Sequence, residues 1–550
     1  MGRRRAVSDR LVVDLGTFGD SGSEPAPTAG EDAARGGRKG LRLPSRARLT
    51  RQAVAAGVVA LLALSSWGMS ADIRDRERAD RLISAPGGVL SLAAAPRVAW
   101  SARTESSTTS FMPGLVVVQR GTTLHGLDAG TGVERWQVPV DAGARCRTAS
   151  SARGGPAVVD PLVCWDGPDA DRQVTVVHAD GTWTQRTLGD GVVWAAGTAD
   201  GGVATARLVG PAPPTDQVRV TPLDGGGASV DGRITQGQDV VVRLEDATTG
   251  TERWEHTLHF HAVPDVWSCV TVSEDRTGAH PTYSASVRPP EVVGVGTLVE
   301  VRGCGVQGAF TADGAAVGDL SSSSSALAEP YVDGGILEHV SGDQGVTSAW
   351  QGPERTVRFG AQVLNPAATD GTPSDLVLAG VAPVTLRAYT PAGTQRWRSA
   401  HGYGDLLARA NGVAVMTLLE GGAAGVDLRT GKQLWLDTDL VPGTYGPDAV
   451  PRSGFTDGRV AALLVTTALV RSEDGTTVSV DAGGGTAELV GVDLVTGAIR
   501  WRIPLPGYLD QVDAVQGHLV VTSENAVPTG AAAGLDVPAT PTAGTVVVLR

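Results

Sequence analysis

A ten-residue pattern with fixed spacing recurs along the chain and constrains its fold more than any other feature. Four segments align without gaps and share Asp-x-x-Thr-Gly-x-x-x-Trp: LDAGTGVERW (127–136), EDATTGTERW (245–254), VDLRTGKQLW (426–435) and VDLVTGAIRW (492–501). A fifth copy, YTPAGTQRW, keeps Gly393 and Trp397 but has Tyr389 in place of the aspartate. Two weaker copies, VHADGTW (177–183) and FTADGAAV (310–317), keep the turn and lose the correctly placed tryptophan. A repeat of this kind predicts a fold assembled from copies of one unit.

Each copy has the chemistry of a β-hairpin. An aspartate side chain can accept hydrogen bonds from backbone N–H groups two or three residues further on. The glycine supplies the positive φ of a tight turn, and the tryptophan can pack between neighbouring sheets. Short β-branched runs such as LVVV and VAALLV separate the copies, with no convincing helix between them. The structural positions of the repeat are therefore Asp128, Gly132, Trp136, Asp246, Gly250, Trp254, Gly393, Trp397, Asp427, Gly431, Trp435, Asp493, Gly497 and Trp501.

This repeat resembles the tryptophan-docking motif of the quinoprotein-like (PQQ-like repeat) β-propellers, over about 450 residues. The resemblance implies an all-β propeller whose blades stack around a ring. The chain ends in GTVVVLR where another motif should begin, and PRVAWSA near residue 97 supplies a strand with Trp100 and no preceding turn. We expect that N-terminal strand to complete the last blade. Seven internal turns plus this composite blade predict eight blades, with seven as the alternative.

Residues for catalysis are not marked by the sequence. Quinone enzymes of the family hold their cofactor against two adjacent cysteines, and no two cysteines are adjacent here. We therefore expect no cofactor, no metal and no catalytic set. HTLHFH contains His256, His259 and His261, which we interpret as exposed imidazoles of an outer strand. DGPDAD (166–171) lacks the spacing of an EF-hand and is interpreted as a polar turn.

The N-terminal region predicts a membrane anchor. Residues 1–51 form a basic tail of disordered composition, with eleven Arg or Lys against six acidic residues. Residues 52–71 include the uncharged segment AVAAGVVALLALSSWGMSA, long enough for one transmembrane helix. The basic flank places the N-terminus in the cytoplasm and the rest outside, and a cleaved signal peptide is the alternative. Residues 72–96 are expected to form a stalk and linker, and residues 97–550 the propeller ectodomain.

Charge and cysteines fit an exported domain. The net charge is −13, and since the tail contributes +5, the remainder carries about −18, which argues against nucleic acid as a partner. The four cysteines allow three pairings, and we expect the two local disulfides Cys146–Cys164 and Cys269–Cys304.

These features predict a single-pass protein of the cell membrane whose extracellular propeller binds or scaffolds an envelope protein or polymer. Non-catalytic relatives of this shape include an outer-membrane-assembly propeller lipoprotein. This chain has no lipobox cysteine near its apolar segment, so that particular role does not carry over. Two alternatives stay open: an enzyme with its site at the central channel, and an envelope sensor that signals through the cytoplasmic tail.

Overall fold

The computed structural model describes one of two compact units. The chain divides into Met1–Ala71 and Asp72–Arg550. The described residues belong to the second unit and are 75–550, apart from 105–108, 142, 147–157, 167–171, 213, 215–216, 223–227, 264–265, 267–268, 276–281, 297, 318–325, 343–344, 353–354, 382–384, 419–420, 439, 441–449, 467–486, 506–510 and 524–543. The expected tail and transmembrane segment lie outside this part. No helix among the described residues is both long and apolar enough to cross a membrane.

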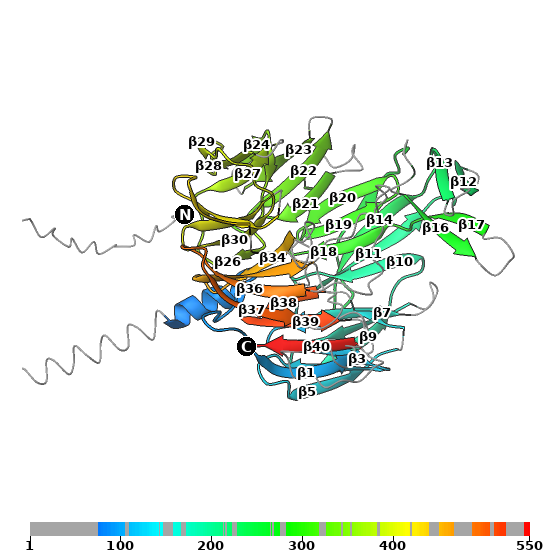
Figure 1. Cartoon of the computed structure of the whole chain (residues 1–550). Helices are drawn as coiled ribbons and strands as arrows, with labels where there is room; N and C mark the ends of the chain where they lie inside the picture. The colour runs from blue at the N-terminus through cyan, green and yellow to red at the C-terminus, as the bar shows by residue number, and fades with distance from the viewer. Residues whose placement is uncertain are drawn as a thin grey trace, which may run out of the picture. The chain divides into compact units, whose positions relative to one another are not determined.

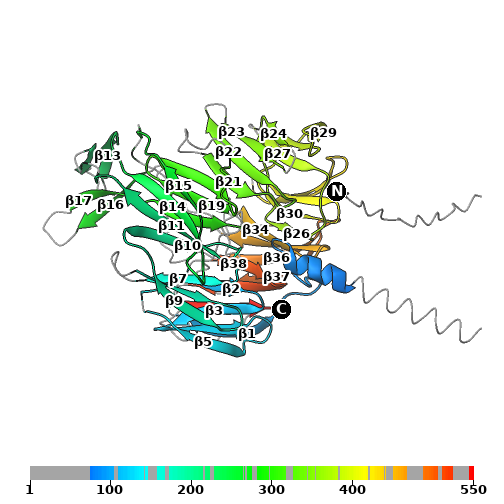
Figure 2. The same cartoon turned by 180° about the vertical axis from the view of Figure 1, so that it is seen from behind.

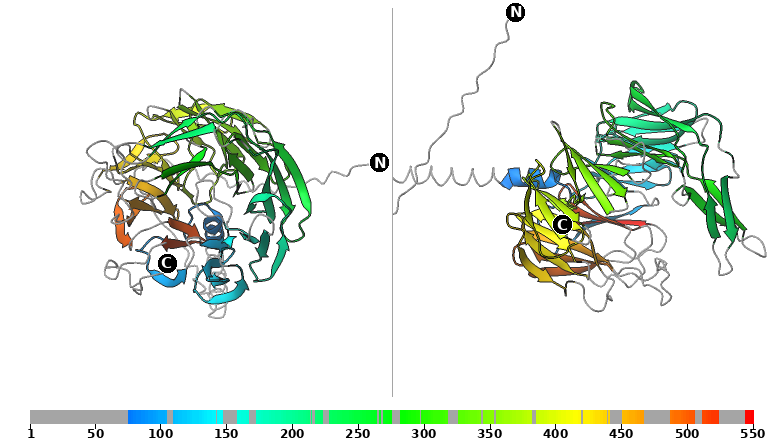
Figure 3. Two further views of the ribbon diagram at one scale, coloured as in Figure 1. Left: turned by 90° about the vertical axis from the view of Figure 1, so that its right-hand side faces the viewer. Right: turned by 90° about the horizontal axis from the view of Figure 1, so that it is seen from above.

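Among the described residues, nine sheets of three to five strands follow one another along the chain and around a ring (Figure 3). Blades 1 to 3 consist of β2 (Ser110–Met112), β3 (Leu115–Arg120), β4 (Thr123–Asp128) and β5 (Glu134–Pro139); β6 (Arg145–Cys146), β7 (Leu162–Asp166), β8 (Gln173–Val177) and β9 (Trp183–Thr187); and β10 (Val192–Gly197), β11 (Gly202–Val209), β14 (Asp239–Asp246) and β15 (Glu252–Leu258).

The middle blades are less regular. Blades 4 to 6 consist of β18 (Glu291–Val295), β19 (Leu298–Gly303) and β20 (Val306–Thr311); β21 (Ala326–Pro330), β22 (Ile336–Gly342), β23 (Gly345–Gln351) and β24 (Thr356–Phe359); and β25 (Gln362–Val363), β27 (Val377–Val381), β28 (Thr385–Tyr389) and β29 (Gln395–Arg398). Two additional ribbons pair β12 (Val218–Pro222) with β13 (Ala228–Gly232) and β16 (Val270–Asp275) with β17 (Thr282–Val287).

The last blade joins both ends of the ring. Blades 7 to 9 consist of β26 (Ala368–Thr369), β30 (Leu406–Ala410), β31 (Val413–Thr417), β32 (Ala423–Asp427) and β33 (Gln433–Asp437); β34 (Val450–Thr456), β35 (Val460–Thr466), β36 (Ala487–Asp493) and β37 (Ile499–Leu505); and β38 (Gln511–Val515), β39 (His518–Ser523), β40 (Gly544–Leu549) and β1 (Val98–Thr104). The antiparallel pairing of β1 with β40 confirms that the strand carrying Trp100 completes the last blade (Figure 1).

The expected count of eight blades, with seven as the alternative, is wrong, because nine main sheets are present. The blade that the sequence did not predict is β21–β24. Its hairpin lacks the repeat motif, so this stretch of the sequence was interpreted as an insertion. Gly345 stands five residues before Trp350, whereas Gly132 stands four before Trp136. The indole N–H of Trp350 bonds to the carbonyl of Gly334 in its own blade at 2.9 Å, instead of to a turn of the next blade.

The cores lie between successive sheets. The clusters of buried apolar side chains join adjacent blades, as where β30, β35 and β36 contribute Leu407, Leu463 and Val490, all fully buried. Each blade hides both faces of its inner strands, which explains why β3 and β35 read as continuous apolar runs instead of alternating ones.

The turns define two faces of the ring. Apart from β26, which pairs in parallel with β30, consecutive strands of a blade are antiparallel. In a blade of four antiparallel strands, the turns from first to second and from third to fourth strand therefore meet on one face. Backbone hydrogen bonds join these paired turns, from Ala129 N–H to Gly114 O (2.9 Å) and from Leu428 N–H to Gly412 O (2.9 Å). We call this side the docking-turn face. The turns from second to third strand and the connections between blades form the return face.

Candidate functional site

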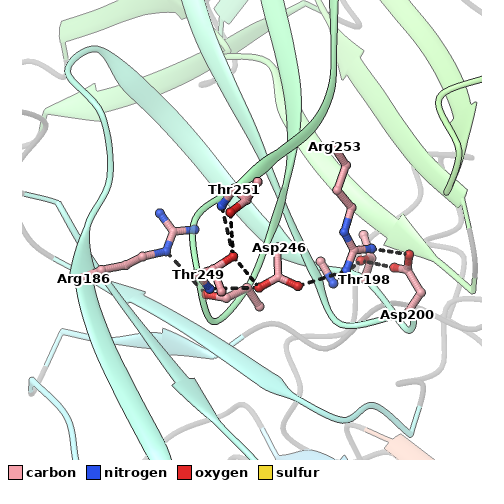
Figure 4. A network of polar contacts seen from close by, with 9 residues as sticks. Arg186, Thr198, Asp200, Asp246, Thr249, Thr251 and Arg253 are labelled. Carbon is pink, nitrogen blue, oxygen red and sulfur yellow. Dashed lines mark hydrogen bonds and ion pairs between the residues drawn. The ribbon is translucent and has the colours of Figure 1, made fainter.

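The aspartate of each full repeat closes its own turn. Asp128 Oδ1 accepts hydrogen bonds from the backbone N–H (3.0 Å) and the hydroxyl (2.8 Å) of Thr131, three residues on. The same pair of bonds forms at Asp246, Asp427 and Asp493. In Figure 4, Thr249 bonds to Asp246, and Arg253 bridges Asp246 and Asp200. These carboxylates are held by their own hairpins and serve the fold.

Arginines on the following strand stabilise the ionised form of two of these aspartates. The Arg135 guanidinium donates to Asp128 at 2.7 Å and, with the Thr131 hydroxyl, lowers the pKa of that carboxyl to about 2. Arg500 donates to Asp493 at 2.6 Å and in the same way lowers its pKa to about 2. Charge-assisted bonds of this kind favour the carboxylate over the acid.

Six tryptophans carry the contact from one blade to the next. Five indole N–H groups donate to a backbone carbonyl in the turn of the next blade: Trp100 to Ala129 (3.0 Å), Trp136 to Ala179 (3.1 Å), Trp254 to Ala312 (3.1 Å), Trp397 to Leu428 (2.7 Å) and Trp435 to Leu494 (2.8 Å). The sixth, of Trp501, donates to the carbonyl of Leu92 (2.8 Å), in the segment before β1. The rings lie on the turn glycines of the neighbour. A Cβ on Gly431 or Gly497 would sit 2.4 or 2.6 Å from the nearest indole atom.

Other side chains replace tryptophan where the motif is incomplete. In blade 2, Arg186 lies against Gly250, points Nε at the carbonyl of Ala247 (3.4 Å) and pairs with Glu245 at 2.7 Å. In blade 5, Val357 faces Gly393 of the next blade. The repeat positions thus form contacts between blades, and no reacting group is gathered by them.

The segment expected to be a stalk and linker packs on the ring. Residues 75–84 are helical, and Leu82 is buried. We call residues 86–92 the strap, because backbone bonds tie it across three blades: Thr369 N–H to Pro86 O (2.8 Å), Thr456 N–H to Gly87 O (2.9 Å), Val89 N–H to Thr456 O (2.9 Å) and Leu90 N–H to Gly517 O (3.0 Å). Its last residue, Leu92, accepts Trp501 and so replaces the docking turn that blade 9 lacks. No residue pattern in the strap signals this role.

The two ribbons form a small extension on the return face. β12–β13 is inserted between the second and third strands of blade 3, and β16–β17 lies in the connection from blade 3 to blade 4. Ile234 and Val263 exchange backbone bonds of 3.1 and 2.8 Å, and both are buried with Val230 and Val266 in a core of their own. We call 217–235 and 259–290 the extension. Figure 1 shows β12, β13, β16 and β17 on the other side of the blades from the blue helix, and Figure 2 shows β13, β16 and β17 there from behind.

Both expected disulfides are confirmed. Cys146 and Cys164 join paired residues of β6 and β7 within blade 2. Cys269 and Cys304 join the start of β16 to the turn between β19 and β20, and so fasten the extension to blade 4. No free cysteine occurs, because all four are paired.

Three neighbouring hollows mark the docking-turn face. The largest, of about 990 Å³, lies over blades 6 and 7, and two of about 230 and 270 Å³ adjoin the helix at 75–84. Asp370 and Asn411 line the hollows of about 990 and 230 Å³, while Arg78 and Arg459 line the hollows of about 230 and 270 Å³. Sequence reasoning missed these hollows, since their residues come from the helix, the strap and three blades.

One polar chain has the composition of a hydrolytic triad. Ser348 donates to His339 Nδ1 at 2.7 Å, and His339 Nε2 lies 3.3 Å from Glu329. However, Ser348 is only 3% exposed and its oxygen already accepts the backbone N–H of Val363 at 2.9 Å. A nucleophile must be reachable by its substrate, and this hydroxyl is buried. These hydrogen-bonded side chains therefore link blade 5 to blade 6.

Two histidines of HTLHFH, His256 and His259, contact different residues. His256 stacks on Phe310 (4.6 Å between ring centres) and bonds to the carbonyl of Gly314, whereas His259 pairs with Asp239 at 2.9 Å. In the described part of the chain no three His, Cys, Asp or Glu side chains are grouped to hold a metal. Residues 167–171 of DGPDAD lie outside the described residues.

Burial raises the pKa of two carboxyl groups. Asp513, on the first strand of blade 9, accepts one bond from Gln511 (3.0 Å), and burial raises its pKa to about 7. Burial also raises the pKa of Glu300, which is fully buried beside Arg302. Desolvation favours the neutral acid in both cases.

The ring of nine sheets defines the chain as a β-propeller. No family model and no curated protein matches the sequence. Among solved structures, BamB from Moraxella catarrhalis is similar at 12% identity, with 83% of this chain and 99% of that chain covered and a TM-score of 0.36. Saccharomyces cerevisiae Sqt1 is similar at 11% identity, with 74% and 98% covered and a TM-score of 0.28. The assignment of the fold rests on the sheets themselves, and these likenesses add nothing about function.

Proposed function

We propose that the chain is a membrane-anchored extracytoplasmic propeller that binds or scaffolds an envelope protein or polymer, without catalysis. The repeat is of the quinoprotein-like type and carries no quinone. The observation that supports a binding role is the extension. A ring needs no such structure to close, yet two insertions pair there, build a separate core and share a disulfide with blade 4. Function in propellers resides in such added surfaces on the fold.

The enzyme alternative has less support among the described residues. The nearest catalytic arrangement is Ser348 with His339 and Glu329, and there the hydroxyl is buried. The elevated pKa of Asp513 comes from burial, and the one described side chain bonded to it is the neutral Gln511.

Site-specific photocrosslinking tests the binding role. A photoreactive residue at Val287 of β17, or at Arg219 of β12, is expected to give a discrete adduct in the native envelope. The same residue at Leu436, 52% exposed on the outer strand of blade 7, is the control and should not give that adduct. Identical adducts from both places, or none from the extension, would contradict this surface.

Membrane anchoring needs a separate test. The full chain is expected to remain in the membrane after alkaline carbonate extraction, and deletion of residues 53–71 should release it. Protease added outside the cell should reach the propeller. Release of the intact chain by carbonate would contradict the anchor.

A further inference from the structure

The helix at residues 75–84 leaves the ring from the docking-turn face. Its Arg78 guanidinium donates to the backbone carbonyl of Asp457, in the turn between the first two strands of blade 8. Leu82 is 1% exposed, and the backbone of Arg81 contacts Gly371 near blade 7. The strap then continues along the same turns. Therefore the direction from which the chain arrives is fixed on this face.

The chain between the apolar segment and this helix is short. This step rests on the proposed anchor at residues 53–71. Three residues, 72–74, separate the end of that segment from the first described helical residue, Asp75. Four peptide steps reach at most about 14 Å. The turns that hold the helix must accordingly stay within a few tens of ångströms of the bilayer surface.

The surface chemistry of this face suits a lipid interface. Arg81, Arg396, Arg429 and Arg459 line the hollows and are exposed, and their side chains make no bond or ion pair with other described residues. Asp370, Asp375, Asp427, Asp457 and Asp493 line the same hollows, and Asp427, Asp457 and Asp493 accept hydrogen bonds from the backbone of their own turns. Arginine carries a charged head for phosphate on a stem that tolerates apolar surroundings.

Exposed apolar side chains gather beside these arginines. Leu90, Leu434 and Val495 line the same hollows and are 38, 44 and 52% exposed. Val133, in the docking turn of blade 1, is 61% exposed. Arginines and aliphatic side chains side by side are typical of surfaces that rest in the headgroup region of a membrane.

We propose that the docking-turn face of blades 6 to 8 rests on the outer surface of the membrane that holds the anchor, and that its arginines bind the phosphates of anionic lipid headgroups. The extension, on the return face, then projects away from the membrane toward its partner. The strap fixes this orientation because it joins the arriving helix to three blades.

Fluorescence quenching in nanodiscs tests the orientation with the full chain. A fluorophore is attached through Val495→Cys on the docking-turn face or, as the control, through Val287→Cys on the extension. The discs contain phosphatidylcholine with or without phosphatidylglycerol, and a lipid spin-labelled at its headgroup. Strong quenching is expected at position 495 and none at 287, with phosphatidylglycerol increasing the effect at 495.

A charge variant tests the lipid contact itself. Arg429→Gln with Arg459→Gln should lower the ratio of membrane-resting to free orientations by roughly fivefold per arginine in discs with phosphatidylglycerol. Arg219→Gln with Arg233→Gln, an exposed pair in the extension, should leave it unchanged. An incorporated chain that is unquenched at 495, or a quenching that ignores phosphatidylglycerol and the arginines, overturns this proposal alone. A chain that does not enter the discs contradicts the anchor.

Discussion

Two of the docking tryptophans, Trp136 and Trp435, are each enclosed by two glycines. Trp435 faces Gly425 across its own hairpin and lies on Gly497 of the next blade, and a Cβ on either glycine would fall within 2.6 Å of the indole. The same arrangement surrounds Trp136 and Trp501 on the side of the hairpin. The indole therefore occupies the space that two missing side chains leave, and its N–H reaches a backbone carbonyl behind them.

Gly497→Ala, compared with a control glycine, should distinguish the cost of crowding the indole from the cost of a positive φ. Gly497 has φ +73°, and an added Cβ would approach Trp435 Cγ to 2.6 Å. We expect the free energy of unfolding to fall by about 3 kcal/mol, of which about 1 is backbone strain and the rest overpacking. Gly412→Ala is the matched control, since its φ is +75° with nothing within 4 Å of the added carbon, and should cost about 1 kcal/mol. Equal losses in urea unfolding would refute the docking explanation.

Asp513 makes a prediction about pH. Its folded pKa of about 7 lies above its ordinary value of 3.8, so the native state binds a proton that the unfolded chain releases. Stability should fall as pH rises from about 4 to 7, by up to roughly 4 kcal/mol, and then level off. Asp513→Asn should flatten this decline and raise stability near pH 8, measured as unfolding free energy against pH. The exposed Asp231→Asn should change neither, and a decline that persists in the Asp513 variant would exclude this carboxyl as its source.

The hydrogen bonding of the turns was predictable from the residues, whereas the side chains that replace tryptophan between blades were not. Asp128, Thr131 and Gly132 carry their bonding in their side-chain types and spacing, and the structure shows the expected hairpin. Arg186 and Val357 stand at docking positions without tryptophan, and nothing local distinguishes them from surface residues. Their role depends on which glycine the neighbouring blade presents.

At the scale of elements, the repeat in the sequence does not predict the roles of the strap and the extension. The strap has no repeat motif, because it supplies a carbonyl from Leu92, and any residue has one. The two insertions are visible as interruptions of the repeat, but their pairing through Ile234 and Val263 is a contact between separate segments. Blade 5 was missed for a related reason, since Trp350 docks within its own sheet.

Leu92→Ala tests the strap as the missing turn of blade 9. Leu92 is fully buried against the core of blades 8 and 9, so its truncation should cost about 3 kcal/mol. Hydrogen exchange should accelerate in β37, β38 and β39 and stay unchanged in blade 3. Ile83→Ala, on the exposed side of the helix, should have little effect. Uniform acceleration around the ring would argue against a local role.

The second disulfide should stabilise the extension and leave the ring alone. Cys269→Ser with Cys304→Ser is expected to remove about 2–4 kcal/mol from the extension, seen as faster hydrogen exchange in β12, β13, β16 and β17. The unfolding midpoint of the ring should stay constant. Cys146→Ser with Cys164→Ser, inside blade 2, should instead lower that midpoint. A ring midpoint that falls equally in both variants would contradict an extension of separate stability.

At the scale of the whole molecule, both termini of the ring meet in blade 9. Arg97 and Arg550 exchange backbone bonds of 2.8 Å, and β1 pairs with β40 along its length. Trp100 then docks on blade 1 and links the closing blade to the first. Ring closure thus depends on one composite sheet and on the docking of its tryptophan.

Trp100→Ala should weaken closure of the whole ring. Loss of the indole and its bond to Ala129 is expected to cost about 3 kcal/mol and to expose the amides of β1 and β40 together. Trp350→Ala, which removes an indole docked inside one blade, should disturb only β21–β24. Hydrogen exchange with mass spectrometry distinguishes the two. Protection of β1 that survives Trp100→Ala would show that strand pairing alone holds the ring.

The composite blade also sets an order of events during synthesis. β1 is made early, but the partner strand that completes its ladder spans Gly544–Leu549, more than 400 residues later. Until then β1 carries unpaired backbone groups on the edge where β40 will pair, and blade 1 lacks the indole that covers Gly132. An open strand edge pairs readily with other chains. The nascent protein therefore has a long interval in which that edge is open to pairing with other chains, and the interval ends only when the final strand is made.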